Sequence, residues 1–120
     1  MHLIEQTACE LLAQGQVFVL ATIVGHEGAT PRTAGSKMIV TRKGRGIGTI
    51  GGGSLEVAVM ARAIHLIKQE QSEMMHFDLG GDVLTAGDMI CGGSADVLLA
   101  CVAPTPTNRA IFSQWQQVLE

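Results

Sequence analysis

The sequence predicts a single α/β domain of the α+β type, in which about three helices pack on one mixed β-sheet. Three observations indicate this class. Stretches with helical periodicity occur at both ends and in the middle of the chain, β-branched runs occur singly and in pairs, and glycine- or proline-containing breaks separate them. With 120 residues, of which 47% are hydrophobic and 16% charged, the chain has the size and composition of one folded domain, residues 1–120.

The order of elements follows from the spacing of apolar residues. Helical spacing predicts helices over residues 2–14, 55–70 and 108–119. Strands are predicted over residues 16–24, 37–41, 46–50, 73–78 and 95–102. The first of these strands is apolar on both faces, which is typical of a central strand. Because the strands do not alternate regularly with helices, we expect a mixed sheet and not a doubly wound parallel one.

Charge and composition exclude several classes of function. The net charge of −3 and the pI of about 5.7 disfavour a nucleic-acid partner, which requires a basic face. No apolar run approaches the ~20 residues of a membrane span, so we expect no membrane association. The three cysteines, Cys9, Cys91 and Cys101, form no zinc-like pair and no disulfide framework. These features predict a cytoplasmic location.

Basic residues concentrate in one stretch of the chain. Five of the eight Lys and Arg residues lie within it: Arg32, Lys37, Arg42, Lys43 and Arg45. The stretch has two interpretations. One is a solvated hairpin, and the other is a surface that faces phosphate groups.

A glycine-rich turn separates a predicted strand from the clearest predicted helix. Gly51, Gly52 and Gly53 precede Ser54, with Glu56 in the first helical turn. The first N–H groups of a helix have no intrahelical partner, and the helix dipole adds positive charge there. Glycines allow positive φ angles and close approach of a ligand. The turn is therefore interpreted as an anion site, and a tight turn without a ligand is the alternative.

A second glycine turn contains a cysteine. Cys91, Gly92 and Gly93 end a long polar loop and precede the strand at residues 95–102. Backbone donors near a glycine-flanked cysteine stabilise a thiolate, the form that ligates metals or attacks electrophiles. The alternative is a small buried residue, the usual role of a free cysteine and the one expected for Cys9 and Cys101. We predict that the two turns form two walls of one site.

Three blocks in order resemble the N-terminal domain of the XdhC/CoxI family, whose members serve the maturation of molybdenum hydroxylases. The first, residues 27–38, is similar to the family pattern EGSSPRxxGxKM. The second, residues 48–56, is similar to G-(S/T)-(I/V)-GGGxLE. The third, residues 89–93, is similar to MxCGG and is followed by a strand.

The resemblance implies that the chain binds the molybdenum cofactor, a pterin dithiolene with a phosphate, and delivers it to a xanthine or carbon monoxide dehydrogenase-type apoenzyme. It implies a phosphate site at Gly51–Gly53 with Ser54 and Glu56, and positive charge from Arg32 and Lys37. Cys91, beside Gly92 and Gly93, would face the molybdenum. The implied partners are an apo molybdenum hydroxylase and a cysteine desulfurase. No residue is assigned a catalytic role.

The sequence departs from the family pattern in two respects. Ser54 stands where the family often has a cysteine, so a two-thiol scheme loses one thiol. Many members also continue into a Rossmann-like second domain, which is absent from residues 1–120. We expect either a single-domain member or a chain cut near Pro104–Pro106.

Two other classes of function stay open at this point. A thiol-dependent enzyme would use Cys91 as its nucleophile, with His26 or His76 as the base. An interaction module would bind its target or itself without a small ligand. The mean hydropathy of +0.30 is high for a small monomer, and it favours a homodimer that buries an apolar face.

Overall fold

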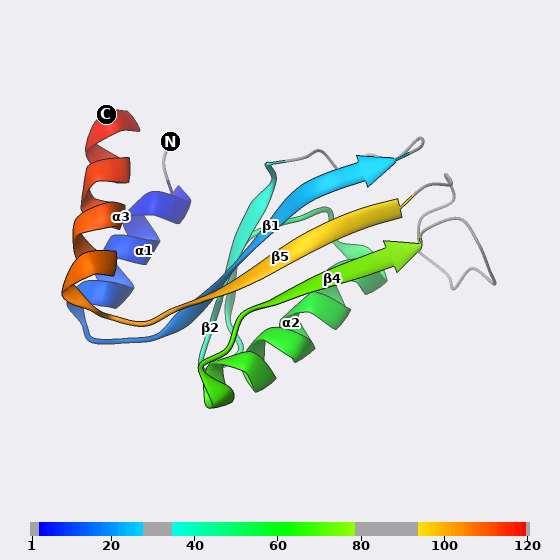
Figure 1. The fold of residues 1–120 in the computed structure, drawn as a ribbon, viewed down its shortest axis with the longest axis horizontal. Coiled ribbons are helices and arrows are strands. Elements are labelled where there is room, and N and C mark those ends of the chain that lie inside the picture. Colours follow the sequence, from blue (N-terminus) through cyan, green and yellow to red (C-terminus); the bar gives the residue numbers. More distant parts are fainter. Residues whose placement is uncertain (1–2, 28–34, 79–93, 120) are drawn as a thin grey trace.

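The computed structural model describes residues 3–27, 35–78 and 94–119. Figure 1 shows how the elements are arranged, with colours that follow the order of the chain. The described residues form three helices, α1 (Leu3–Ala13), α2 (Gly53–Gln69) and α3 (Pro106–Leu119). They also form five strands, β1 (Phe18–Glu27), β2 (Lys37–Thr41), β3 (Gly46–Gly48), β4 (Glu73–Asp78) and β5 (Ser94–Val102). The predicted α+β class with three helices on one sheet is confirmed.

The five strands lie in the order β3-β2-β1-β5-β4. All four pairings between neighbouring strands are antiparallel, so the predicted mixed sheet is wrong in this respect. The reason lies in the connections. β2 and β3 form a hairpin, β4 and β5 pair as sequence neighbours, and α2 carries the chain from one edge of the sheet to the other. No described connection returns the chain to a neighbouring strand in the same direction, which a parallel pair requires.

Helix α2 covers one face of the sheet. Its apolar side buries Leu55, Val59, Ala63, Leu66 and Ile67. These residues pack against inward-facing side chains of the central strands, among them Val19, Ala21, Val97 and Leu99. Because neighbouring strand residues point to opposite faces, this contact fixes which residues of each strand face α2.

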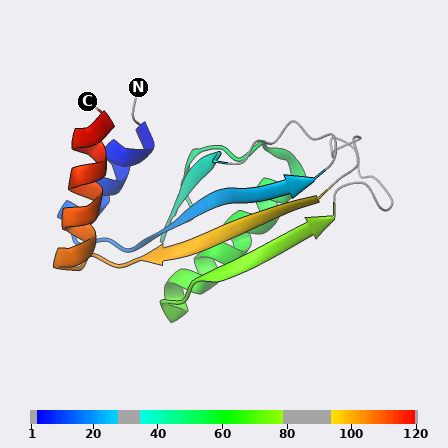
Figure 2. The ribbon, with the colours of Figure 1, turned by 45° about the horizontal axis from the view of Figure 1, so that its top comes forward.

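Helices α1 and α3 pack together on one end of the opposite face, as Figures 1 and 2 show. Their cluster centres on Phe18, whose ring lies edge-on to that of Phe112 with centroids 5.9 Å apart. The rest of this face carries partly exposed side chains from three strands. Val24 and Met74 expose 47% and 55% of their surface there. The described helices therefore cover one face along α2 and only part of the other.

A close approach of backbone to backbone occurs at Gly48, at the end of β3. Its φ angle is +84°, and a Cβ added there would lie 2.8 Å from the carbonyl oxygen of Lys37 and 2.7 Å from Cδ1 of Ile4. Only glycine fits without displacement of α1 or β2. This residue fixes the position of the chain immediately before the glycine turn.

None of the helices in the described ranges is long and apolar enough to cross a membrane.

Candidate cofactor-binding site

The glycine turn lies between the end of β3 and the start of α2. Ile50, immediately before the glycines, is buried in the core next to α2. Its burial anchors the start of the turn. Gly51, Gly52 and Gly53 all have positive φ angles, of 120°, 74° and 68°. L-residues rarely adopt such angles, so the sequence of three glycines is what allows this path. The prediction that α2 begins here is confirmed, two residues earlier than the periodicity indicates.

The surface of the turn is open. Gly51, Gly53 and Ser54 are exposed. Within the described parts of the chain, a Cβ built on Gly52 would meet no atom within 4 Å. Gly52 is the N-cap of α2, with φ 74° and ψ −164°. The positive end of the helix dipole is thus presented to a region in which a ligand can approach the backbone closely.

A carboxylate already interacts with part of the turn. Oε1 of Glu56 accepts the N–H of Gly52 at 3.0 Å and the N–H of Ile50 at 3.2 Å. The same atom accepts the hydroxyl hydrogen of Thr49 at 2.6 Å. These contacts show Glu56 capping the start of the helix. The next two residues of the helix, Gly53 and Ser54, are exposed.

Thr49 is a residue of this site that the sequence analysis did not single out. Its hydroxyl donates to Glu56 and accepts the N–H of Gly51 at 3.0 Å. A signal for it exists in the sequence. A threonine at the end of a strand, two residues before the glycines and seven before a glutamate, can bridge the turn to the helix it precedes.

Lys37 lies on the other side of the sheet from α2. Its neighbour Met38 packs in the core under α2, and side chains alternate along β2. The Nζ atom of Lys37 donates to the carbonyl oxygen of Gly35 at 2.9 Å. The contribution of this ammonium group to an anion site at the glycine turn stays a prediction.

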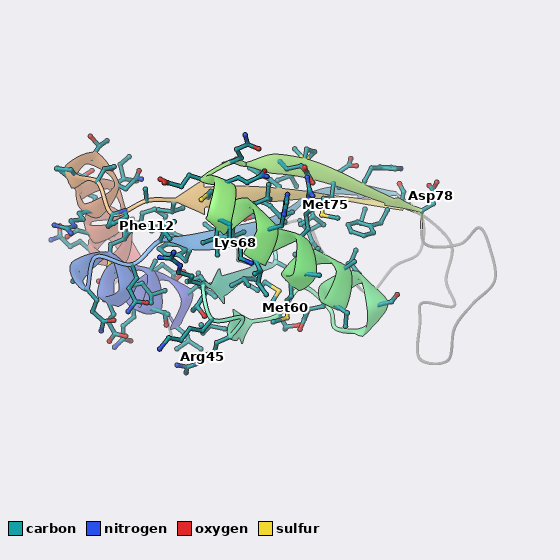
Figure 3. The ribbon with its side chains drawn as sticks, turned by 90° about the horizontal axis from the view of Figure 1, so that it is seen from below. Arg45, Met60, Lys68, Met75, Asp78 and Phe112 are labelled. Carbon is teal, nitrogen blue, oxygen red and sulfur yellow. The ribbon has the colours of Figure 1, made fainter. Side chains whose placement is uncertain are left out.

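The remaining predicted site residues, Arg32, Cys91, Gly92 and Gly93, lie outside the described residues. Their flanking positions are described. Ser94, where β5 begins, pairs with Glu27 and with Asp78, where β1 and β4 end. In Figures 1 and 3 this end of the sheet is also the end where α2 begins. The attachment points of both segments are therefore on the same side as the glycine turn, and a shared site stays a prediction.

His76, one of the two histidines considered as a base, lies on β4 on the face opposite α2. Its Nδ1 atom is 2.6 Å from Oδ1 of Asp96, and its Nε2 atom is 3.4 Å from Oδ1 of Asp78. The hydrogen bond with Asp96 raises the pKa of His76, with desolvation acting in the opposite direction and the charges of both aspartates adding to the rise. This pairing favours the imidazolium form, which is a poorer base than neutral imidazole.

The two described cysteines are held as partly buried thiols. Cys9 lies on α1, and its Sγ donates weakly to the carbonyl oxygen of Phe112 at 3.4 Å. Burial, together with the charges of Glu10 and Glu5, raises the pKa of Cys9. Burial and the charge of Glu70 raise the pKa of Cys101. In the described ranges, no three His, Cys, Asp or Glu side chains gather as a group that could hold a metal ion.

Comparison with known proteins places these features in a family. The chain is 30% identical over 113 residues to the uncharacterized protein YqeB of Escherichia coli, across 87% of this chain and 21% of that protein. It is 41% identical over 69 residues to a protein of Bacillus subtilis described as a probable xanthine dehydrogenase component, across 58% of this chain and 21% of the relative. It is 26% identical over 113 residues to the molybdenum cofactor insertion chaperone PaoD of Escherichia coli, across 92% of this chain and 34% of PaoD.

A solved structure has a similar fold. The crystal structure of a xanthine dehydrogenase from Bacillus halodurans matches 92% of this chain and 33% of its own length, with a TM-score of 0.73 and 28% identity. The chain thus spans between about a fifth and about a third of the length of these relatives. The model of the XdhC and CoxI family matches residues 11–78, which include the glycine turn and more than half of the 120 residues. The chain belongs to the XdhC and CoxI family.

Proposed function

We propose that this chain is a maturation factor for a molybdenum hydroxylase, which binds the molybdenum cofactor and delivers it to the apoenzyme. The observation that carries the proposal is family membership together with 26% identity to the insertion chaperone PaoD over 92% of the chain. The names of two further relatives, which refer to xanthine dehydrogenase, support a hydroxylase of this type as the target. We propose an accessory role, in the cytoplasm, and not a catalytic one.

The glycine turn is the proposed phosphate site. The bound cofactor would supply a phosphate, an anion suited to the start of α2. The N–H groups of the exposed residues Gly53 and Ser54 and the hydroxyl of Ser54 would hold it. Glu56 would stabilise the turn from within through Gly52, while its negative charge would keep the phosphate on the outer side. The open space at Gly52 leaves room for this approach.

Residues of the other two sequence blocks would complete the site. We propose that Cys91, between Met89-Ile90 and Gly92-Gly93, faces the molybdenum as a soft thiolate ligand. Arg32 would add positive charge near the phosphate. A cysteine desulfurase and a second copy of the chain are proposed as further partners. A thiol-dependent enzyme that uses Cys91 is the competing function.

The proposal is tested by the molybdenum and pterin retained after purification from cells that make the cofactor. We expect wild-type protein to retain both, and Cys91→Ala to retain less. Cys101→Ala is the matched control, because Cys101 is partly buried on β5 and packs against the core under α2. Equal retention by all three proteins would remove Cys91 from the site. Absence of cofactor from the wild type would overturn the binding function.

A second pair of variants tests the phosphate site separately from folding. Ser54→Asp adds a negative charge to the first turn of α2, where it stabilises the helix through the dipole but repels a phosphate. Ser113→Asp adds the same charge to the exposed side of α3. We expect Ser54→Asp to keep or raise the unfolding midpoint and to lose cofactor, whereas Ser113→Asp retains it. Unchanged retention in Ser54→Asp would exclude the turn as the phosphate site.

A further inference from the structure

A cleft of about 400 Å³ lies at the end of the sheet away from the glycine turn. Four segments that are distant in the sequence form it. These are the connection from α1 to β1, the β2–β3 turn, the last turn of α2 and the connection from β5 to α3. Its lining includes Val17, Arg42, Lys43, Ile67, Lys68 and Glu70.

The rim of the cleft carries three cations. Arg42 and Lys43 come from the β2–β3 turn, and Lys68 comes from the last turn of α2, where Figure 3 labels it. All three side chains are exposed. Among the described residues, none of them forms an ion pair with a carboxylate. In a chain of net charge −3, this is a local concentration of positive charge that the fold assembles from two elements.

Apolar side chains form part of the lining of the cleft. Ile67 is only 3% exposed and belongs to the core under α2, and Val17 packs against the same core. The ring of Pro104 lines the cleft beside them. A ligand in this cleft would therefore meet charge at its rim and hydrocarbon beneath, which is how sites for small organic anions are commonly built.

One carboxylate also lines the cleft. Glu70 is the C-cap of α2 and has a φ angle of 53°, which directs the chain back toward β4. A bare inorganic anion would be repelled by this group. An organic anion that also carries N–H or O–H donors would gain a hydrogen bond from it. The cleft therefore favours an organic ligand that carries both an anionic group and hydrogen-bond donors over a simple inorganic anion.

We propose that this cleft binds a small organic phosphate whose other end carries hydrogen-bond donors, as a nucleoside monophosphate does. Arg42, Lys43 and Lys68 hold the phosphate, the organic part lies on Val17 and Ile67, and Glu70 accepts from its donors. The site is separate from the glycine turn, because the 17 residues of α2 place about 25 Å between the two ends of that helix. The proposal for this cleft therefore does not depend on cofactor binding at the glycine turn.

The test is a titration of the whole chain with three probes. Binding is measured from amide chemical shifts or by calorimetry. The probes are adenosine 5′-monophosphate, inorganic phosphate and adenosine. We expect saturable binding of the monophosphate, at least about tenfold tighter than either part alone, with shifts confined to the four segments of the cleft. The absence of saturable binding, or equal affinity for inorganic phosphate and the monophosphate, would overturn the proposal.

Matched variants distinguish specific binding in the cleft from non-specific electrostatic attraction to the surface. Arg42→Gln removes a rim cation, and Arg45→Gln removes the same charge from the same turn but outside the cleft. We expect Arg42→Gln to weaken monophosphate binding roughly tenfold and Arg45→Gln to change it little. Glu70→Gln is expected to strengthen inorganic phosphate binding and to weaken the preference for the monophosphate. Equal effects of Arg42→Gln and Arg45→Gln would reduce the interaction to surface electrostatics and refute the site.

Discussion

The hydroxyl of Thr49 donates to Oε1 of Glu56 over 2.6 Å, and through this contact the end of β3 is tied to the first turn of α2. The same carboxylate oxygen accepts the backbone N–H groups of Ile50 and Gly52. A single side-chain atom thus stabilises a turn of three glycines that has no side chains of its own. Because glycines lose more conformational entropy on folding than other residues, ordering this turn is costly, and these hydrogen bonds offset part of that cost.

We expect Glu56→Ala to lower the free energy of unfolding by about 1–2 kcal/mol, because it removes the acceptor that three donors share. Thermal or urea denaturation measures this loss. Thr49→Val removes the hydroxyl with little change of shape. A double-mutant cycle between the two positions should give a coupling energy of at least about 0.5 kcal/mol. Additive losses would show that the two residues stabilise the turn separately.

Gly48 and Gly15 offer a comparison of two glycines with similar backbone angles. Both have positive φ, of 84° and 73°, but only Gly48 has atoms within 4 Å of an added Cβ. Alanine at either site should cost about 1 kcal/mol for the backbone angle. Gly48→Ala should cost clearly more, because its Cβ would lie 2.8 Å from the carbonyl oxygen of Lys37. Denaturation midpoints of the two variants give the difference, and equal losses would contradict the packing argument.

The pairing of His76 with Asp96 predicts a pH dependence of stability. The pKa of His76 is raised in the folded chain, so its contribution is fully present below the unfolded value of about 6.5. The contribution is lost as the pH rises through the folded pKa. The unfolding midpoints of wild type and Asp96→Asn should therefore differ most below the unfolded pKa of His76. They should converge once the pH exceeds its folded pKa.

An NMR titration of the His76 ring checks the same prediction directly. Asp96→Asn should lower the pKa of His76, because it removes the hydrogen bond that contributes most to the rise. Asp78→Asn should have a smaller effect, since Asp78 is farther away, at 3.4 Å. A pKa that is the same in wild type and Asp96→Asn would show that this contact is not made in solution.

The raised pKa values of Cys9 and Cys101 predict slow alkylation of both thiols in the native chain. Since the thiolate is the reactive form, iodoacetamide at neutral pH should modify them more slowly than free cysteine. Peptide mass spectrometry at timed intervals measures each site separately. Full modification of Cys9 or Cys101 at the rate of free cysteine would contradict the burial described above. Rapid labelling of Cys91 in the same sample would mark it as the reactive thiol.

Several elements could be predicted to the residue because their signal is local. The strands at Lys37–Thr41 and Glu73–Asp78 have the predicted bounds. Other boundaries depend on capping. α3 begins at Pro106, two residues before its apolar spacing starts, because Oγ1 of Thr105 accepts the N–H of Asn108 and proline suits the first helical position. Apolar periodicity does not contain this capping signal, so it places the start of the helix too late.

Strand pairing and side-chain direction could not be predicted in the same way. Periodicity identifies strands but contains no information on which strands meet, so the antiparallel sheet required the structure. The assignment of Lys37 to the glycine turn rests on its place in the first sequence block. The pleat of β2 adds that Lys37 and Met38 point to opposite faces of the sheet, which the motif does not reveal. Conversely, the basic stretch of the sequence does not indicate that Arg42 and Lys43 line the same cleft as Lys68.

The position of β5 between β1 and β4 determines when this chain can complete its fold during synthesis. β4 hydrogen-bonds to β5 and to no other strand of the described sheet, and β1 has β5 along its whole length on one side. A nascent chain that ends near residue 78 would therefore expose one edge of β1 and hold β4 without a neighbour. All five strands are available only after Val102 has emerged from the ribosome, beyond the end of the segment that the family model matches.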